Sequence, residues 1–197
     1  MTRFILIRHA LTDAVGKTIT GRLPGVYLNE EGKRQVSVLA DQLKGLSVDA
    51  IYSSPMERAI ETAKTIATRH HLNVSVLEEL NEIDCGDWSG CTIEELRSER
   101  SFQLFNSFRS GTRIPGGETM PEVQLRMVNC IEKLVNKHRE QTVALVSHGD
   151  PLKAIACFYM GIHLDLMHKI EINPASVTIL EVYEETARIT SMGSIYY

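Results

Sequence analysis

Five side chains suited to phosphate chemistry lie just after short apolar segments of this chain: Arg8, His9, Arg58, Glu82 and His148. A neutral imidazole can act as a nucleophile, and a carboxyl group can move a proton to or from a reacting oxygen. The two planar guanidinium groups match the oxygens of a phosphoryl group bidentately. This combination of side chains predicts a phosphate ester as the ligand.

Their positions relative to the expected strands favour a shared site. In open α/β sheets the ligand crevice lies outside the carboxyl ends of the strands, and these side chains follow four separate segments. Each has an ordinary structural interpretation when taken alone, such as a surface ion pair or a histidine bonded to the backbone. Four strand ends that all supply groups for one anion favour function over these interpretations.

The apolar segments alternate with stretches of helical periodicity, which is typical of an α/β layer architecture. We expect parallel strands at residues 3–7, 49–53, 73–77 and 142–147, with late strands at 176–182 and 188–191 that pair antiparallel at an edge. Helices are expected at residues 30–44, from 54 onward, at 92–100, at 119–138 and from 150 onward. Together they predict one domain over residues 1–197, a three-layer α/β/α sandwich with a mainly parallel central sheet.

Three helix starts carry capping signals. The segment from Ser54 to Glu57 has serine as the expected N-cap, proline at the first helical position and glutamate three residues after the cap. Thr92 and Thr119 each open a Thr-x-x-Glu sequence, which predicts a capping box at both positions.

Composition restricts the partners and the location. The chain has 197 residues with 21 basic and 25 acidic side chains, a net charge of −4 that gives no indication of a nucleic-acid surface. Its apolar runs are far below the ~18 residues of a membrane span, and the N-terminus lacks the apolar region of a signal peptide, so we expect a cytoplasmic protein without a membrane partner. The four cysteines have no C-x-x-C spacing, which favours reduced and mostly buried thiols.

Five sequence blocks carry the candidate residues in order. They are residues 6–12 (LIRHALT), 52–63 (YSSPMERAIETA), 80–90 (LNEIDCGDWSG), 115–119 (PGGET) and 146–149 (VSHG). The first four resemble the L-x-R-H-G-x-T, S-S-P-x-x-R-A-x-x-T-A, L-x-E-x-x-x-G-x-W-x-G and P-x-G-E-S motifs of the histidine phosphatase superfamily, the phosphoglycerate-mutase-like proteins, and the fifth completes the set. The resemblance therefore implies the phosphoglycerate-mutase-like fold.

The resemblance also implies roles for individual residues. His9 matches the nucleophile that accepts the phosphoryl group, with a backbone carbonyl holding its other ring nitrogen, and Glu82 matches the proton donor to the leaving alkoxide. Arg8, Arg58 and His148 would hold the phosphoryl oxygens. Additional substrate contacts are expected from Thr12, Gly149 and Arg22. The mechanism requires no metal ion and no other cofactor.

Two positions depart from the family pattern. Ala10 stands where glycine is usual, so its backbone must avoid conformations that only glycine adopts easily. Val15 occupies the place of an asparagine near the phosphate, which removes one polar contact.

Other chemistries fit the sequence poorly. The histidines lack metal-binding spacings, and no glycine-rich nucleotide motif follows the first strand. The favoured function is a phosphomonoesterase of a small phosphorylated metabolite, resembling the α-ribazole phosphatase and broad-specificity groups, as a monomer or a homodimer. The alternatives are a phosphoglycerate-type mutase, whose family members tend to be longer, and a catalytically silent phosphate-binding module, which should have lost His9, Glu82 or His148.

Overall fold

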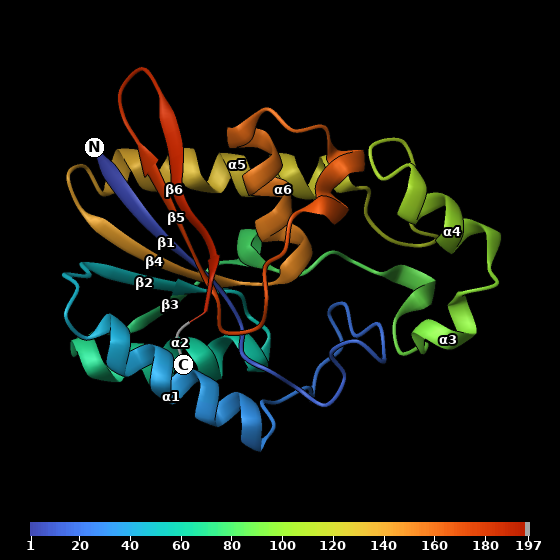
Figure 1. Ribbon diagram of the computed structural model, residues 1–197, viewed down its shortest axis with the longest axis horizontal. Helices are drawn as coiled ribbons and strands as arrows, with labels where there is room; N and C mark the ends of the chain where they lie inside the picture. The colour runs from blue at the N-terminus through green and yellow to red at the C-terminus, as the bar shows by residue number, and fades with distance from the viewer. Residues whose placement is uncertain (196–197) are drawn as a thin grey trace.

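The computed structural model describes residues 1–195, and its central feature is a six-stranded sheet with the order β3-β2-β4-β1-β5-β6 (Figure 1). The pairs β3/β2, β2/β4 and β4/β1 are parallel, whereas β5 pairs antiparallel with β1 and with β6. The strands are β1 (Thr2–Arg8), β2 (Ala50–Ser53), β3 (Val74–Val76), β4 (Thr142–Ser147), β5 (Val177–Val182) and β6 (Ala187–Ser194). The predicted sheet, including its antiparallel edge, is confirmed.

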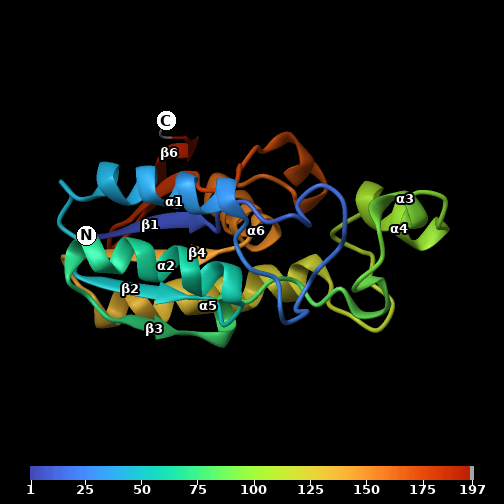
Figure 2. The ribbon, with the colours of Figure 1, turned by 90° about the horizontal axis from the view of Figure 1, so that it is seen from below.

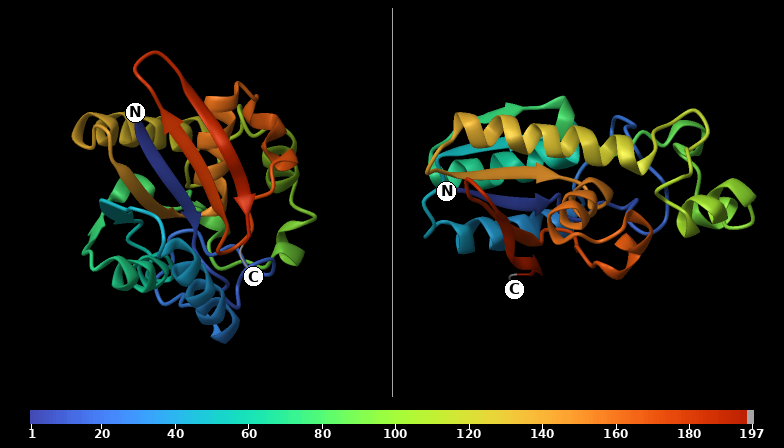
Figure 3. Two further views of the ribbon diagram at one scale, coloured as in Figure 1. Left: turned by 60° about the vertical axis from the view of Figure 1, so that its left-hand side comes forward. Right: turned by 90° about the horizontal axis from the view of Figure 1, so that it is seen from above.

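Helices cover both faces of the sheet, which explains why β1 is almost entirely apolar (Figures 2 and 3). Ile5 and Ile7 pack in one buried cluster with α1 (Glu30–Leu43) and α2 (Glu57–His70). Phe4 and Leu6 pack in a second cluster with α5 (Met120–Lys137) and α6 (Gly149–Met160). The three-layer arrangement is therefore confirmed.

The pairing of β1 with β4 brings two functional segments together. In this register Arg8 lies opposite Ser147, and the backbone N–H of His9 donates to the Ser147 carbonyl at 2.9 Å. At the same end of β4, the N–H of Ser54 donates to the Val146 carbonyl at 2.9 Å. The residues that follow β1, β2 and β4 consequently meet at one end of the sheet.

The predicted start of α2 is wrong. The helix begins at Glu57, its N-cap is Met56, and no side chain caps it. Ser54 lies two residues before this N-cap, where its N–H is still bonded to the Val146 carbonyl of β4. The capping boxes predicted at Thr92 and Thr119 are both present.

The helix expected at residues 92–100 is also different, because two short helices, α3 (Ile93–Leu96) and α4 (Arg100–Ser107), replace it. Glu99 between them is extended, with φ −71° and ψ 124°. The break lets α4 place Phe102 and Phe105 edge-on against Trp88, at ring-centroid distances of 5.3 and 5.5 Å. Figure 2 shows α3 and α4 projecting beyond the end of the sheet, where Thr92 bridges to Thr18 in the loop that precedes α1.

The remaining elements are three 3₁₀ turns, η1 (Glu78–Leu80), η2 (Gly86–Trp88) and η3 (Leu164–Lys169). The four cysteines are free thiols and three of them are buried, as predicted. Within residues 1–195 no helix has the length and apolar character needed to cross a membrane.

Gly32, in the first turn of α1, provides a test of how the loop after His9 is packed. A Cβ atom at this position would lie 2.0 Å from the carbonyl oxygen of Leu11. Although alanine is ordinarily the better helix residue, we expect Gly32→Ala to lower the free energy of unfolding by about 1–3 kcal/mol through overpacking. For a chain of this length that corresponds to a fall in Tm of about 2–4 °C per kcal/mol, measured by thermal denaturation.

Gly45→Ala is the matched control, because a Cβ atom there meets nothing within 4 Å and the backbone is not left-handed. We expect its Tm to equal or slightly exceed that of the unmodified protein. Equal stability of the two variants would contradict the close contact between the loop and α1.

Candidate active site

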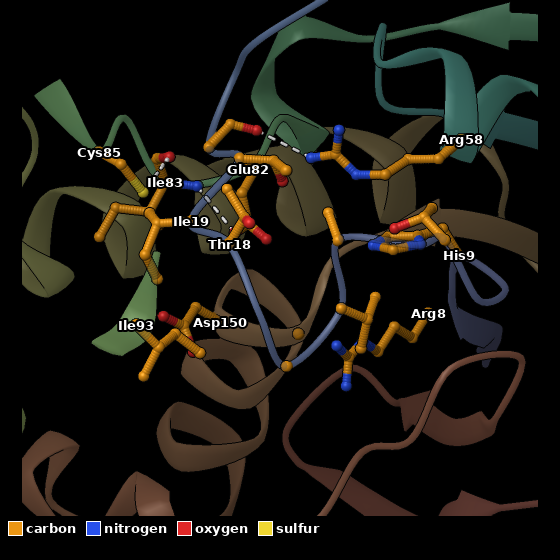
Figure 4. Close-up of a pocket in the computed structure, with 17 residues that line it drawn as sticks. Arg8, His9, Thr18, Ile19, Arg58, Glu82, Ile83, Cys85, Ile93 and Asp150 are labelled. Atoms are coloured by element: carbon orange, nitrogen blue, oxygen red, sulfur yellow. Dashed lines mark hydrogen bonds between the residues drawn. The ribbon is translucent and has the colours of Figure 1, made fainter. Parts of the chain in front are cut away.

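A cavity of about 200 Å³ lies at the carboxyl end of β1 and β4 (Figure 4). The loop between β1 and α1 forms one wall, and the start of α6 forms another. Six of the sequence-predicted site residues line this cavity: Arg8, His9, Thr12, Arg58, Glu82 and Gly149. His148 lies directly beside them, with its ring centroid 5.1 Å from that of His9.

His9 is held as a neutral ring with one nitrogen free. Its Nδ1 lies 2.8 Å from the carbonyl oxygen of Ala10. Since a carbonyl only accepts, Nδ1 carries the proton and Nε2 is left with its lone pair. Burial, reinforced by the positive charge of Arg58, lowers the pKa of His9 to about 3. The ring therefore has the protonation state that a nucleophile needs across the neutral pH range.

Alanine is compatible with the backbone at position 10. The φ of Ala10 lies outside the left-handed region, and its N–H donates to Thr62 Oγ1 at 3.1 Å. The conformational requirement inferred from the sequence is thus met without glycine.

Arg8 and Arg58 flank His9 in Figure 4, and each is anchored by one backbone carbonyl. Arg8 donates to Ile172 at 2.7 Å, and Arg58, which is only 1% exposed, donates to Gly21 at 2.8 Å. Arg8 Nε and Arg58 Nη1 are buried and have no partner among the described residues. Because buried charged donors are costly when left unpaired, the two guanidinium groups form a site for an anion.

Glu82 lies on the segment after η1, with its Oε2 3.9 Å from His148 Nδ1. Burial, followed by the negative charge of Asp150, raises the pKa of Glu82 to about 7, although Arg58 opposes this effect. A carboxyl group with this pKa is partly protonated at neutral pH. It is therefore suited to donate a proton and take it back.

An ion-pair cluster fixes the backbone of Glu82. Arg22 Nε and Arg126 Nη2 donate to the Glu82 carbonyl at 2.9 and 3.1 Å, and both arginines also bond to Glu118. Arg22 is not among the cavity-lining residues, so its contact with substrate stays a prediction. Arg126 was missed in the sequence because it lies within a long helix, whereas Glu118 belongs to the PGGET block.

Asp150 is a second residue that sequence reasoning assigned only a helix-opening role. It lines the cavity in the first turn of α6, and Arg109 Nη1 pairs with its Oδ2 at 3.0 Å. The Arg109 guanidinium also lies over the Phe105 ring at 4.7 Å, which ties α4 to the site. The position of Asp150 directly after the VSHG block is the sequence feature that could have indicated a place in the site.

Comparisons with known proteins identify the family of this chain. The sequence profile described as "Histidine phosphatase superfamily (branch 1)" matches residues 4–195. The chain is 32% identical over 189 residues to phosphoserine phosphatase 1 of Hydrogenobacter thermophilus, covering 93% of this chain and 88% of the relative. It is also 29% identical over 195 residues to a 2,3-bisphosphoglycerate-dependent phosphoglycerate mutase of Thermoplasma acidophilum, covering 97% and 92% of the two chains.

Two solved structures resemble the fold closely. Bacillus stearothermophilus YhfR has a TM-score of 0.93 at 29% identity, covering 99% of this chain and 98% of that protein. Phosphoserine phosphatase of Entamoeba histolytica, an H9A mutant in complex with phosphoserine, has a TM-score of 0.88 at 29% identity and covers 98% of each chain. The chain belongs to the histidine phosphatase superfamily, branch 1. It is a phosphatase of the class that acts on small phosphorylated metabolites.

The unpaired arginine donors predict measurable anion binding. Inorganic phosphate should raise the Tm, because a ligand that binds only the folded state stabilises it by about 2.7 kcal/mol at one hundred times its Kd. In Arg58→Met the shift should be lost, whatever the starting Tm of that variant. Thermal denaturation with phosphate, against chloride at equal ionic strength, measures the effect.

Arg113→Met is the control, since Arg113 pairs with Glu122 on the exposed surface away from the cavity. Its phosphate-dependent shift should match that of the unmodified protein. A shift that survives in Arg58→Met would show that phosphate binds elsewhere.

Proposed function

We propose that the protein is a metal-independent phosphomonoesterase in which His9 carries the phosphoryl group. His9 Nε2 attacks the phosphorus atom and forms a P–N bond while the ester P–O bond breaks. Glu82 supplies a proton to the departing oxygen. The observation that carries this proposal is the neutral His9 ring, held by the Ala10 carbonyl between two arginines that each have a buried, unpaired donor atom.

Electrostatic stabilisation follows from the surrounding side chains. In this mechanism Arg8, Arg58 and His148 bond the three equatorial oxygens of the phosphoryl group, where charge is spread in the transition state. Hydrogen bonds to Ile172, Gly21 and Ser54 anchor the three side chains, so they need little reorganisation. Two fixed guanidinium charges supply the positive field that a divalent ion provides in other phosphoryl-transfer enzymes.

The second half of the reaction returns the enzyme to its starting state. A water molecule attacks the phosphorus of phosphohistidine, and the P–N bond breaks to release inorganic phosphate. Glu82, ionised after the first step, takes a proton from that water. The same carboxyl group thus acts first as an acid and then as a base.

The lining of the cavity favours hydrolysis of a small ester over a phosphoglycerate-type mutase. Arg8 and Arg58 are the only lysine or arginine residues among the described lining residues, and both are assigned to the transferred phosphoryl group. Bisphosphoglycerate carries a second phosphate and a carboxylate, for which the rest of the described wall offers no further lysine or arginine and includes the acidic Asp150. Phosphoserine, named for two relatives, has an ammonium group that balances its carboxylate. It is therefore the first substrate that we propose.

We also propose a cytoplasmic location, supported by the four free thiols. All of the proposed catalytic residues come from one chain. Both a monomer and a homodimer are therefore compatible with the mechanism.

The roles of His9 and Glu82 are separable by their dependence on the leaving group. His9→Ala should reduce turnover to near background for every ester, because the nucleophile is gone. Glu82→Gln should barely slow phosphorylation by an aryl phosphate, since a phenolate leaves without a proton. With phosphoserine, whose alkoxide needs protonation, it should lose much of the roughly 10²–10⁴-fold acid–base contribution. Single-turnover phosphorylation, with both substrates side by side, measures these effects.

Glu79→Gln is the control, because Glu79 lies on η1 close to Glu82 in sequence but pairs with Lys133 on the surface. It should behave like the unmodified enzyme with both substrates. Equal losses with aryl and alkyl substrates in Glu82→Gln would exclude Glu82 as the proton donor.

The alkaline limb of the pH profile should report the Glu82 carboxyl. Since the donor must be protonated, kcat/KM for an alkyl phosphate should fall as pH rises through about 7. Asp150→Asn removes a negative charge that raises this pKa, so the limb should move to lower pH. Initial rates with phosphoserine, measured from about pH 5 to about pH 9 so that the range spans the Glu82 pKa, test this expectation.

Asp165→Asn is the control. Asp165 is also partly buried, but it accepts a hydrogen bond from the Ser110 N–H and is not among the cavity-lining residues. Its alkaline limb should stay in place. A limb that moves to higher pH in Asp150→Asn would contradict the assigned electrostatics.

A further inference from the structure

The second histidine of the site has a buried partner that the mechanism above does not use. His148 Nε2 lies 2.7 Å from Ser54 Oγ, and both residues are 0% exposed. They are separated by 94 positions in the sequence and meet because the segment after β2 runs beside β4. The distance alone leaves open which atom donates the proton.

The other hydrogen bond of the Ser54 hydroxyl shows which atom donates. Met56 N–H donates to Ser54 Oγ at 3.3 Å, so the oxygen already acts as an acceptor. The hydroxyl has one proton, and its only hydrogen-bond acceptor among the described residues is His148 Nε2. If the ring donated instead, the buried hydroxyl proton would have no acceptor, which is unfavourable for a buried donor. Ser54 therefore donates, and His148 Nε2 accepts.

The protonation of the other ring nitrogen follows. Burial, with the positive charges near it, lowers the pKa of His148 well below its ordinary value, so the ring is neutral and has a single proton. With Nε2 as acceptor, that proton is on Nδ1. Nδ1 is buried and has no hydrogen-bond partner among residues 1–195; the nearest carboxylate oxygen, of Glu82, is 3.9 Å away.

We infer that Ser54 is a positioning residue that fixes the tautomer of His148, so that Nδ1–H is presented to a phosphoryl oxygen. The role of His148 in this inference rests on the proposed function. In the opposite tautomer Nδ1 would direct a lone pair at the negatively charged oxygen, replacing an attraction by a repulsion. The hydrogen bond of Ser54 N–H to the Val146 carbonyl holds this serine two residues before the α2 N-cap, where its hydroxyl reaches the His148 ring.

Nitrogen NMR of ¹⁵N-histidine-labelled protein tests the tautomer directly, without substrate. Long-range ¹H–¹⁵N correlations distinguish the two ring nitrogens. The signals that disappear in the His148→Asn variant are those of His148. We expect Nδ1 of His148 to be protonated and Nε2 to be unprotonated. Added inorganic phosphate should shift the Nδ1 signal most.

Ser54→Ala should release the constraint, giving a mixture of the two tautomers and a fall in kcat/KM of about tenfold, the size of one hydrogen bond. Ser53→Ala is the matched control, since Ser53 is also 0% exposed and its hydroxyl donates to a backbone carbonyl, that of Ser54, at 2.8 Å. It loses a buried hydrogen bond of the same kind without touching His148. Its tautomer signals and kcat/KM should stay close to those of the unmodified enzyme.

Several results would overturn the inference. A proton on Nε2 in the unmodified protein would reverse the donor, and an unchanged His148 tautomer in Ser54→Ala would show that Ser54 does not fix it. Equal activity losses in the two serine variants, with unaltered tautomers, would indicate a general packing effect. If the protein has the expected tautomer but hydrolyses no phosphomonoester, the proposed function fails while the assignment of Ser54 as proton donor stands.

Discussion

The parallel pairing of β1 with β4 is the constraint on which the site depends. Each strand ends in a polar segment, and the register that places Arg8 opposite Ser147 makes His9 and His148 neighbours at the carboxyl end of these two strands. The register is strongly determined because β1 is buried on both faces. A shift by one residue would turn Phe4 and Leu6 to the face where Ile5 and Ile7 now pack, and the reverse. The geometry of the reacting groups is therefore set by the same apolar packing that stabilises the fold.

Burial then gives each titratable group its chemical state. The same low-dielectric environment disfavours a charged His9 and a charged Glu82, which gives them the neutral ring and the protonated carboxyl that the proposed mechanism needs near neutral pH. Arg8 and Arg58 keep their charge in this environment because the pKa of a guanidinium is so high. In the proposed function a bound phosphoryl group satisfies their unpaired donors, and the attraction for the substrate comes from the cost of leaving those buried donors without a partner.

Support from outside the cavity holds the catalytic groups in place. Glu118 gathers two arginines that bond to the Glu82 carbonyl, and Arg109 connects the projecting helix α4 to Asp150. No side chain caps the start of α2, where such a cap is typically worth about 1 kcal/mol. Ser54, two residues before the N-cap, has its hydroxyl oxygen 2.7 Å from His148 Nε2.

The fold class and most of the candidate site could be predicted from the sequence, because strand patterns, helix periodicity and the Thr92 and Thr119 caps depend on residues close together in the chain. The order of the polar blocks likewise indicated which side chains would meet at the strand ends. The predictions that failed involve partners distant in sequence: Ser54 was expected to cap a helix, and residues 92–100 to form one helix. Only the tertiary structure decided these points, together with the acceptor for His9 Nδ1. The physical reason is that the pairing of the segment after β2 with β4 sets where Ser54 lies, and this pairing depends on residues far apart in the sequence.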